Sequence, residues 1–451
     1  MVVNRSNQTV QGDFANNKSS PDREGHLFNV GNVSLFEPGL SGIAAIEVSA
    51  PWVYPGTTTR YQRLLIYNTL DAGHPYALDL FRVKGGKVHD YLMHGSMAFD
   101  ETAACTLPLQ KIDKPYPMLL PNEKWTEPRA MGDTFPLYGA FREVGAGRPR
   151  DWWDVVYREA GGNLGTRLIM PGDERTTIYL GRSPAPCRLG FKRERGKEAR
   201  FYDFWRPALI VRREAAEDLD SLFIVVIEPL QGSSAIKGCR RLPLNRDDPE
   251  HVALAVSFVD GREDVVLVDM NAPGITGKPA SAEGVVTADG ACALKGRIGV
   301  LSRKAGSEKK FLIAGTAFSA AGKSLTGAPA FSGTITGAVR PPYAFAGYAL
   351  VTDAELPEGD TLKGRWMSLT FGAYAVVPGS RGTYPAEIKT QEGITGMFQI
   401  ERVVRQQGKT YISTADDHGL AIEGGNTVEQ MRPLRTFKGL PRFEILLSAS
   451  Q

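Results

Sequence analysis

The stretch Tyr76–Gly95, YALDLFRVKGGKVHDYLMHG, places the strongest constraint on the fold of this chain. Apolar and polar side chains alternate on both sides of the Gly85-Gly86 pair, and a pair of glycines is typical of a tight turn. The stretch therefore predicts two extended segments joined at Gly85-Gly86. The second segment concentrates four residues that can carry chemistry: His89, Asp90, Tyr91 and His94.

The same two-residue period recurs along the whole chain, and convincing helical periods are nearly absent. Turn signals such as Asp260-Gly261 and Gln407-Gly408 separate alternating runs, which is typical of hairpins. Arg213–Leu222 could form one short helical turn, but its apolar residues are poorly spaced for a helix. We predict an all-β fold, with a large antiparallel, supersandwich-like β-sandwich followed by a smaller C-terminal β-sandwich domain. The predicted strands are Ile43–Val48, Arg63–Tyr67, Ala77–Val83, Asp154–Arg158, Arg167–Met170, Thr176–Leu180, Leu209–Arg212, Phe223–Ile227, Arg297–Leu301, Phe311–Thr316 and Trp366–Phe371.

A change in composition predicts two domains, 1–250 and 251–451. Before the change the strands are rich in aromatic and charged residues, and after it Gly, Ala, Thr and Ser dominate. The boundary is expected between Asp248 and Ser281. No repeat of fixed length accompanies it, so propellers and solenoids are not indicated.

Composition excludes several classes of protein. The formal net charge of +3 in 451 residues gives no basic field for nucleic acid. No signal-peptide core and no run of about 18 apolar residues is present, which predicts no membrane span. Zinc ribbons, nucleophile elbows, phosphate-binding loops and dinucleotide fingerprints are also missing. The cysteines lie too far apart for paired metal motifs and are expected in the core: Cys105, Cys187, Cys239 and Cys292.

The segment Lys87–Gly95 offers the first candidate site. On a strand, His89 and Tyr91 share one face, whereas Asp90 and His94 share the other. Two ligands do not make a zinc site, so no metal is predicted. His89 and Tyr91 together could abstract and return a proton. The alternative is that both are hydrogen-bonded residues inside a sandwich, and the sequence leaves both possibilities open.

Aromatic and basic residues form the second candidate site. Trp152 and Trp153 open one strand, and an aromatic run at Phe201–Trp205 lies between Arg200 and Arg206. Aromatic faces stack on sugar rings and arginine pairs with carboxylate or sulfate. The same aromatics could instead fill the core between two sheets. A further basic cluster at 192–200 is typical of a solvated loop.

Taken in order, several segments resemble the β-sandwich region of heparinase II/III-type polysaccharide lyases. The resemblance covers most of the chain before about residue 250. Its segments are MVVNRSNQTVQGDF, TTRYQRLLIYNTL, YALDLFRVKGGKVHDYLMHG, WWDVVYRE, RLIMPGDERTTIYLGRSPAP, ALIVRRE and SLFIVVIEPLQG.

The resemblance implies β-elimination on polysaccharides that contain uronic acid. Such lyases have an N-terminal α/α toroid followed by β-sandwich layers, and they work mostly in the periplasm or outside the cell. Their carboxylate substrate is neutralised, a Tyr or His removes the C5 proton, and a Tyr or His protonates the leaving oxygen. A structural divalent metal in the family would use residues upstream of this sequence, so no cofactor is predicted here.

This sequence contains no toroid, and Met1–Asn4 resembles the middle of a strand. Three possibilities follow: the sandwich piece of a lyase, one half of a split lyase with its toroid on a separate chain, or a stand-alone module that binds acidic polysaccharide. None of the family's catalytic residues can be transferred by motif. The candidates are His89 and Tyr91 for catalysis, and Arg60, Arg63, His94, Trp152 and Trp153 for substrate binding.

Overall fold

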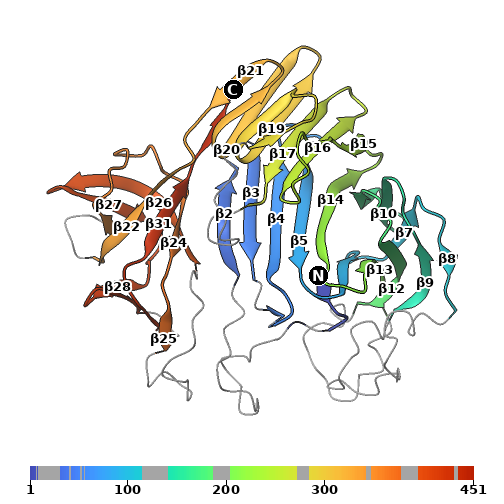
Figure 1. Ribbon diagram of the computed structural model, residues 1–451, viewed down its shortest axis with the longest axis horizontal. Helices are drawn as coiled ribbons and strands as arrows, with labels where there is room; N and C mark the ends of the chain where they lie inside the picture. Colours follow the sequence, from blue (N-terminus) through green and yellow to red (C-terminus); the bar gives the residue numbers. More distant parts are fainter. Residues whose placement is uncertain are drawn as a thin grey trace.

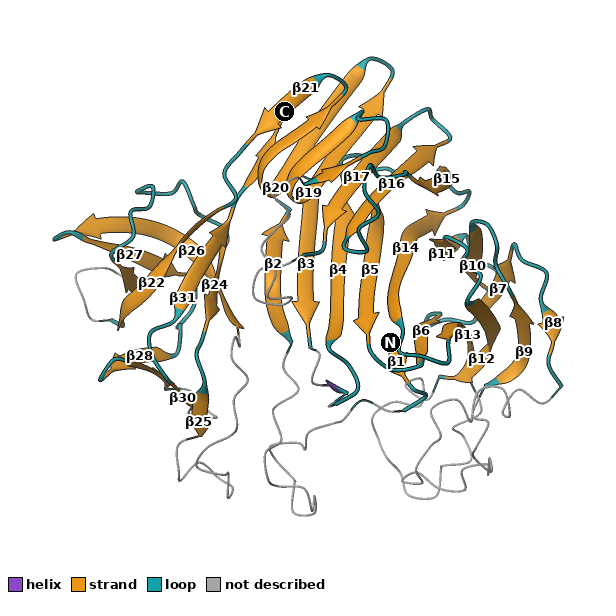
Figure 2. Ribbon diagram, in the orientation of Figure 1, coloured by secondary structure: helices purple, strands orange, loops and turns teal. Residues whose placement is uncertain are grey.

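The described part of the chain is all-β, as predicted, and all of its named elements are strands (Figures 1 and 2). The computed structural model describes residues 1–6, 8, 31–39, 42–50, 53–54, 56–113, 141–185, 204–271, 284–341, 347–376, 395–430 and 435–451. None of these residues belongs to a helix that is long and apolar enough to span a membrane.

An eight-stranded antiparallel sheet forms the centre of the molecule, and we call it the central sheet. Its strands come from the part of the chain between residues 32 and 231. Its strands, in spatial order, are β2 (Asn32–Pro38), β3 (Ile43–Ser49), β4 (Arg60–Asn68), β5 (Tyr76–Lys84), β14 (Asp220–Gln231), β11 (Leu164–Met170), β10 (Trp153–Glu159) and β7 (Glu101–Cys105).

A six-stranded sheet, the small sheet, packs on one face of the central sheet. Its strands, in spatial order, are β1 (Val2–Val3), β6 (Val88–His94), β13 (Trp205–Glu214), β12 (Thr176–Pro184), β9 (Arg142–Gly147) and β8 (Gln110–Lys111). The hairpin β5–β6 therefore does not stay in one sheet. After the Gly85-Gly86 turn, where both glycines have positive φ, the chain crosses from the central sheet to the small sheet.

A third sheet packs on the opposite face of the central sheet. Its main strands are β15 (Ile236–Arg241), β16 (His251–Phe258), β17 (Glu263–Asp269), β19 (Cys292–Lys304), β20 (Ser307–Ala320) and β21 (Lys323–Thr326), with β18 (Val285–Val286) on β19 and β32 (Ser448–Ser450) on β20.

Strand alternation explains how the central sheet serves two cores. In β14, Ile224 and Val226 belong to the core shared with the third sheet, while Phe223 and Val225 belong to the core shared with the small sheet. Successive side chains of a strand point to opposite faces, so a strand buried on both sides must be apolar throughout. The run LFIVVI in β14 meets that requirement.

The C-terminal part is also all-β, and its strands close into a six-stranded barrel. The barrel lies beside β2, to the left in Figure 1. Phe36 meets Trp366 edge-on at 5.3 Å, and Arg365 lies 3.5 Å from the buried Glu37. The barrel order is β22 (Ala330–Val339), β23 (Tyr348–Thr352), β27 (Lys409–Thr414), β26 (Thr395–Gln406), β24 (Trp366–Thr370) and β31 (Arg442–Leu446); a separate sheet contains β25 (Tyr374–Val376), β30 (Arg435–Phe437), β29 (Asn426–Glu429) and β28 (Leu420–Glu423).

The positions of the strands bear on two points that the sequence raises. No helical turn forms at Arg213–Leu222, because β13 runs to Glu214 and β14 starts at Asp220. The boundary expected between Asp248 and Ser281 falls on β16 and β17, inside the third sheet, and 272–283 lie outside the described residues. The change in composition accompanies the passage from the central sheet to the third sheet, and the barrel starts later, at β22.

Buried ion pairs join the central sheet to the third sheet. Arg297 on β19 donates from Nη2 to both carboxylate oxygens of Glu47 on β3, at 2.7 and 2.8 Å. Ser34 donates to the same carboxylate at 2.5 Å, and Glu47 is fully buried. Removal of one partner from such a pair leaves an uncompensated charge in the interior.

We predict that Glu47→Leu lowers the free energy of unfolding by about 3–5 kcal/mol, because Arg297 is left unpaired. Urea denaturation followed by tryptophan fluorescence measures the change. The control is Glu355→Leu, which removes the exposed partner of Arg405 in the barrel, 2.9 Å away. An exposed pair contributes at most about 1 kcal/mol. Equal losses in the two variants would contradict the prediction.

Candidate functional site

Part of the central sheet is left uncovered by the other described sheets, and we call this surface the open face. It comprises the outward side chains of β3 and β4: Ala44, Ile46, Val48, Leu65 and Tyr67. Their neighbours in sequence, such as Ala45 and Leu64, point into the core with the third sheet. The barrel meets β2 on one side, and the small sheet covers β5 and β14 on the other. Tyr67 is 44% exposed, and the other side chains are half-buried.

Arg63, Asp79 and Tyr91 form a hydrogen-bonded cluster at the margin of the open face. Arg63 donates to Asp79 from Nε at 3.0 Å and from Nη2 at 2.7 Å. Tyr91, on the small sheet, donates its hydroxyl to Asp79 Oδ2 at 2.7 Å. Asp79 is fully buried, whereas the Arg63 side chain is 42% exposed. The cluster thus ties the two sheets together and presents one cation outward.

The pKa shifts in this cluster favour a permanent charge on Arg63 and disfavour proton transfer by Tyr91. The hydrogen bonds that Arg63 donates to Asp79 raise the pKa of Arg63, so its guanidinium stays charged. Burial, followed by the nearby Asp79 carboxylate, raises the pKa of Tyr91 well above its ordinary value. A phenol in that state is a poor general base. Its ring stacks on Phe223 at 5.8 Å, which is typical of a core residue.

His89 lies on the same face of β6 as Tyr91, since both side chains contact the central sheet. Its Nδ1 lies 2.9 Å from Ser221 Oγ, and its Nε2 lies 2.8 Å from the Gly85 carbonyl oxygen. Both ring nitrogens are therefore engaged, and the residue is fully buried. Burial lowers the pKa of His89, which keeps the ring neutral. These contacts are those of a hydrogen-bonded residue inside a sandwich, which is the second of the two possibilities that the sequence leaves open for His89.

Asp90 and His94 project from the other face of β6. Asp90 accepts two hydrogen bonds from Arg212 on β13, at 2.7 and 2.9 Å, and both residues are buried. Burial, aided by Arg206, lowers the pKa of His94 to about 4. No group of three His, Cys, Asp or Glu side chains that could hold a metal occurs in the described residues.

Arg60 lies away from the open face, although it shares a strand with Arg63. It is buried and donates from Nη2 to the Met270 carbonyl oxygen at 2.7 Å, and it also contacts Glu250. Those partners belong to the third-sheet side of the molecule. Arg60 therefore joins two layers of the molecule.

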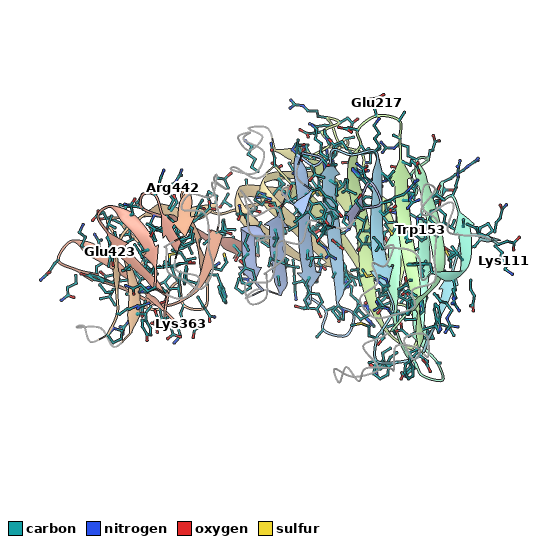
Figure 3. All side chains as sticks on the ribbon, turned by 90° about the horizontal axis from the view of Figure 1, so that it is seen from below. Lys111, Trp153, Glu217, Lys363, Glu423 and Arg442 are labelled. Carbon is teal, nitrogen blue, oxygen red and sulfur yellow. The ribbon has the colours of Figure 1, made fainter. Side chains whose placement is uncertain are left out.

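The tryptophans predicted to bind substrate lie in the two cores. Trp153 is 2% exposed, in the core between the central and small sheets, and Figure 3 labels it within the sandwich. Trp152 packs against the core on the other side of the central sheet. Phe201, Tyr202 and Arg200 of the second aromatic run lie outside the described residues. Trp205 is described, and the Arg142 guanidinium lies 4.9 Å above its ring.

Of the residues predicted from sequence, the structure brings Arg63 and Tyr91 together, with His89 nearby on β6. It separates Arg60, His94, Trp152 and Trp153 from them. Sequence reasoning missed Asp79 and Tyr67. Asp79 did have a signal: it is a single carboxylate inside the apolar strand YALDLF, and such a residue is expected to have a buried partner.

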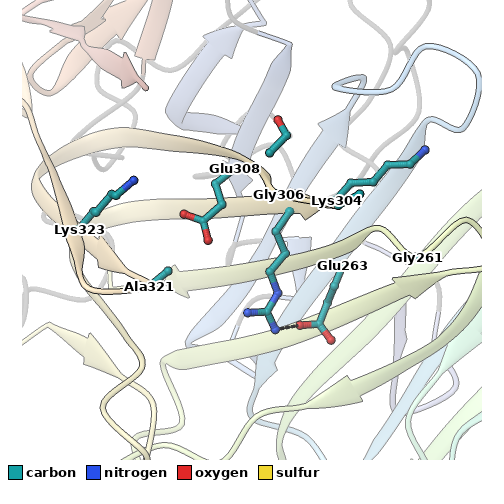
Figure 4. Close-up of a pocket in the computed structure, with 10 residues that line it drawn as sticks. Gly261, Glu263, Lys304, Gly306, Glu308, Ala321 and Lys323 are labelled. Carbon is teal, nitrogen blue, oxygen red and sulfur yellow. Dashed lines mark hydrogen bonds and ion pairs between the residues drawn. The ribbon is translucent and has the colours of Figure 1, made fainter.

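A wide hollow of about 1010 Å³ lies at the hairpin tips of the third sheet (Figure 4). Two of its basic side chains already form ion pairs. Arg303 contacts Glu263 at 2.5 Å, and Lys304 contacts Asp260 at 2.6 Å. We therefore place the candidate site at the open face and not at this hollow.

Comparison with known proteins does not add to this geometry. No protein-family model matches the chain, and no curated protein matches its sequence.

We predict that His94 makes stability fall with decreasing pH. Its folded-state pKa of about 4 lies below the ordinary value of 6.5, so the unfolded chain binds more protons between these values. The contribution is complete above about pH 6.5 and is lost towards about pH 4. Buried His89 shifts in the same direction.

Urea denaturation of wild type and His94→Asn, at about pH 7 and about pH 4.5, tests this prediction. The drop in unfolding free energy should be smaller in His94→Asn. His74→Asn, which changes an exposed histidine, should keep the wild-type drop. An identical drop in all three proteins would refute the assignment to His94.

Proposed function

We propose that this chain supplies the β-sandwich portion of a polysaccharide lyase that acts on uronic-acid polysaccharides by β-elimination. One observation carries the proposal: an exposed, fixed cation and an exposed aromatic ring lie on the same face of one strand. Arg63 and Tyr67 are four residues apart on β4, which corresponds to about 13 Å. An arginine suits a sugar carboxylate, and a tyrosine ring suits a pyranose face.

Arg63 is held ready for an anion by Asp79. Its Nε and Nη2 bind Asp79, and within the described residues no partner is found for Nη1. A guanidinium fixed in this way loses little side-chain entropy when a ligand binds. In β-elimination its role is to neutralise the substrate carboxylate, which makes the C5 proton more acidic.

The base and the acid of the reaction are assigned to the toroid that the family resemblance implies. The candidates on this chain are His89 and Tyr91. Their polar atoms already form hydrogen bonds with Ser221, Gly85 and Asp79. The open face supports this division, because half-buried Ile46, Val48 and Leu65 form an apolar surface of the kind that a second domain covers. A toroid on the same or a separate chain would complete the site.

The second candidate function is a binding module without catalysis. The complete hydrogen bonding of His89 favours it, since a catalytic histidine needs a ring nitrogen that can reach the substrate. Both functions require acidic polysaccharide to bind at the open face. They differ in whether a toroid partner confers elimination.

We predict that Tyr67→Ala weakens binding of an oligouronate about three- to tenfold, through loss of the ring contact. Isothermal titration with hexagalacturonate and with a heparin hexasaccharide measures the change. Tyr67→Phe keeps the ring and should bind like wild type. Leu164→Ala removes an equally exposed apolar side chain elsewhere on the central sheet and serves as the control.

Ultraviolet absorbance of unsaturated uronate tests whether the base and the acid lie on a toroid and not on this chain. The chain alone should give a flat trace on acidic polysaccharides while it binds them. A rise would show that this chain holds a complete elimination site and would refute the assignment of base and acid to a toroid. Absence of binding to every acidic saccharide would contradict the proposed function itself.

A further inference from the structure

A second concave site lies at the end of the molecule far from the barrel, where Lys111 is labelled in Figure 3. It is a groove of about 510 Å³ between the edge strand β7 of the central sheet and the small sheet. We call it the edge groove. Glu101, Thr102 and Ala103 line one wall, and Lys111, Arg182 and Pro207 line the other.

The β7 wall offers main-chain hydrogen-bonding groups. Among the described strands β7 is the last of the central sheet, and β10 bonds one of its sides. Ala160 N–H donates to the Asp100 carbonyl oxygen, and Thr106 N–H donates to that of Asp154. Antiparallel strands alternate in this way, so even-numbered residues of β7 face β10. The N–H and C=O of Ala103 therefore point to the unpaired side.

The small-sheet wall is basic. Residues paired across a sheet share a face, and Lys111 pairs with Gly145, which pairs with the inward-facing Leu180. In the next row Arg142 pairs with Arg182, and Arg182 pairs with Pro207. Three cations thus lie on the inward side of two neighbouring rows.

A β-bulge creates this arrangement. Between the pairs Leu180–Gly145 and Arg182–Arg142, β9 has two residues and β12 has one. Glu143 takes the irregular position with φ 53°. Gly181 is required there, because a Cβ would approach the Arg142 carbonyl oxygen to 2.8 Å. Bulges re-aim side chains at the edges of sheets.

Two carboxylates, Glu101 and Glu143, line the groove together with the cations Lys111 and Arg182. Glu101 accepts a hydrogen bond from the Ser96 N–H at 2.5 Å, so one of its oxygens is engaged. Glu143 is at the rim, 72% exposed and 3.9 Å from Arg182.

We infer that the edge groove binds an extended acidic segment of a partner polypeptide, which pairs with β7 as a ninth strand of the central sheet. The main-chain groups of Ala103, for which no partner is found among the described residues, supply backbone hydrogen bonds, and Lys111 and Arg182 supply charge complementarity for alternate acidic side chains. A polypeptide is favoured over an acidic saccharide because only a polypeptide can continue the ladder. This site is separate from the open face and does not depend on the proposed function.

Fluorescence anisotropy with the full chain tests the inference. The probe is a capped, fluorescein-labelled octapeptide that alternates Glu with Thr, so its carboxylates lie on one face of the strand. Saturable binding is expected. An octapeptide that alternates Lys with Thr, and an acidic one with a central proline, should each bind at least tenfold more weakly.

Two variants separate backbone pairing from charge. Ala103→Pro removes the outward N–H, and proline is tolerated on edge strands where that N–H faces away from the ladder. It should weaken the acidic probe at least tenfold with an unchanged melting temperature. The double variant Lys111→Glu, Arg182→Glu should reverse the preference in favour of the Lys probe, and it decides the matter if Ala103→Pro fails to fold.

Arg402→Glu is the matched control, because Arg402 is an exposed barrel arginine with an ion pair of the same 3.9 Å length as that of Arg182. It should bind the acidic probe like wild type. No binding of the probe, wild-type affinity in the charge-reversed variant, or full displacement by hexagalacturonate would overturn the inference. Tyr67→Ala should leave probe binding intact, which separates this test from that of the open face.

Discussion

The burial of both faces of the central sheet is the constraint on which the rest of the structure depends. β5 and β14 pair along their length and contribute alternate side chains to two cores. A charged group that enters either core needs a partner, because an unpaired buried polar group costs more than a hydrogen bond gains. The pairs Arg63–Asp79 and Arg82–Asp220 follow from that rule.

The same constraint explains why side chains with catalytic potential have structural contacts here. In sequence, HDYLMH contains an acid, two histidines and a phenol. In the fold, Tyr91 binds Asp79, His89 binds Ser221 and the Gly85 carbonyl, and Asp90 binds Arg212. Each hydrogen bond compensates for the dehydration of its own group. A residue type alone does not distinguish such a role from catalysis, whereas the partner atoms do.

Local patterns predicted the strands well, because alternation and glycine turns depend on neighbours in sequence. The hairpin turns at Asp260-Gly261 and Gln407-Gly408 both occur where expected. Pairing between distant segments could not be predicted in this way. β14 lies between β5 and β11, and β32 returns to β20 after the whole barrel, so neither neighbour is encoded locally. For the same reason Arg63 was a candidate without its partner Asp79.

The offset between the layers accounts for the position of both surfaces proposed to bind ligands. The central sheet has eight strands and the small sheet six, and the small sheet packs mainly over β5, β14, β11 and β10. One result is that β3 and β4 keep an open face beside Arg63. The other is that β7 ends the sheet next to the basic wall at Lys111 and Arg182. The small sheet covers only part of the central sheet. The groups proposed to bind ligands therefore lie on strands and not on loops, and each of these strands is paired with a neighbouring strand.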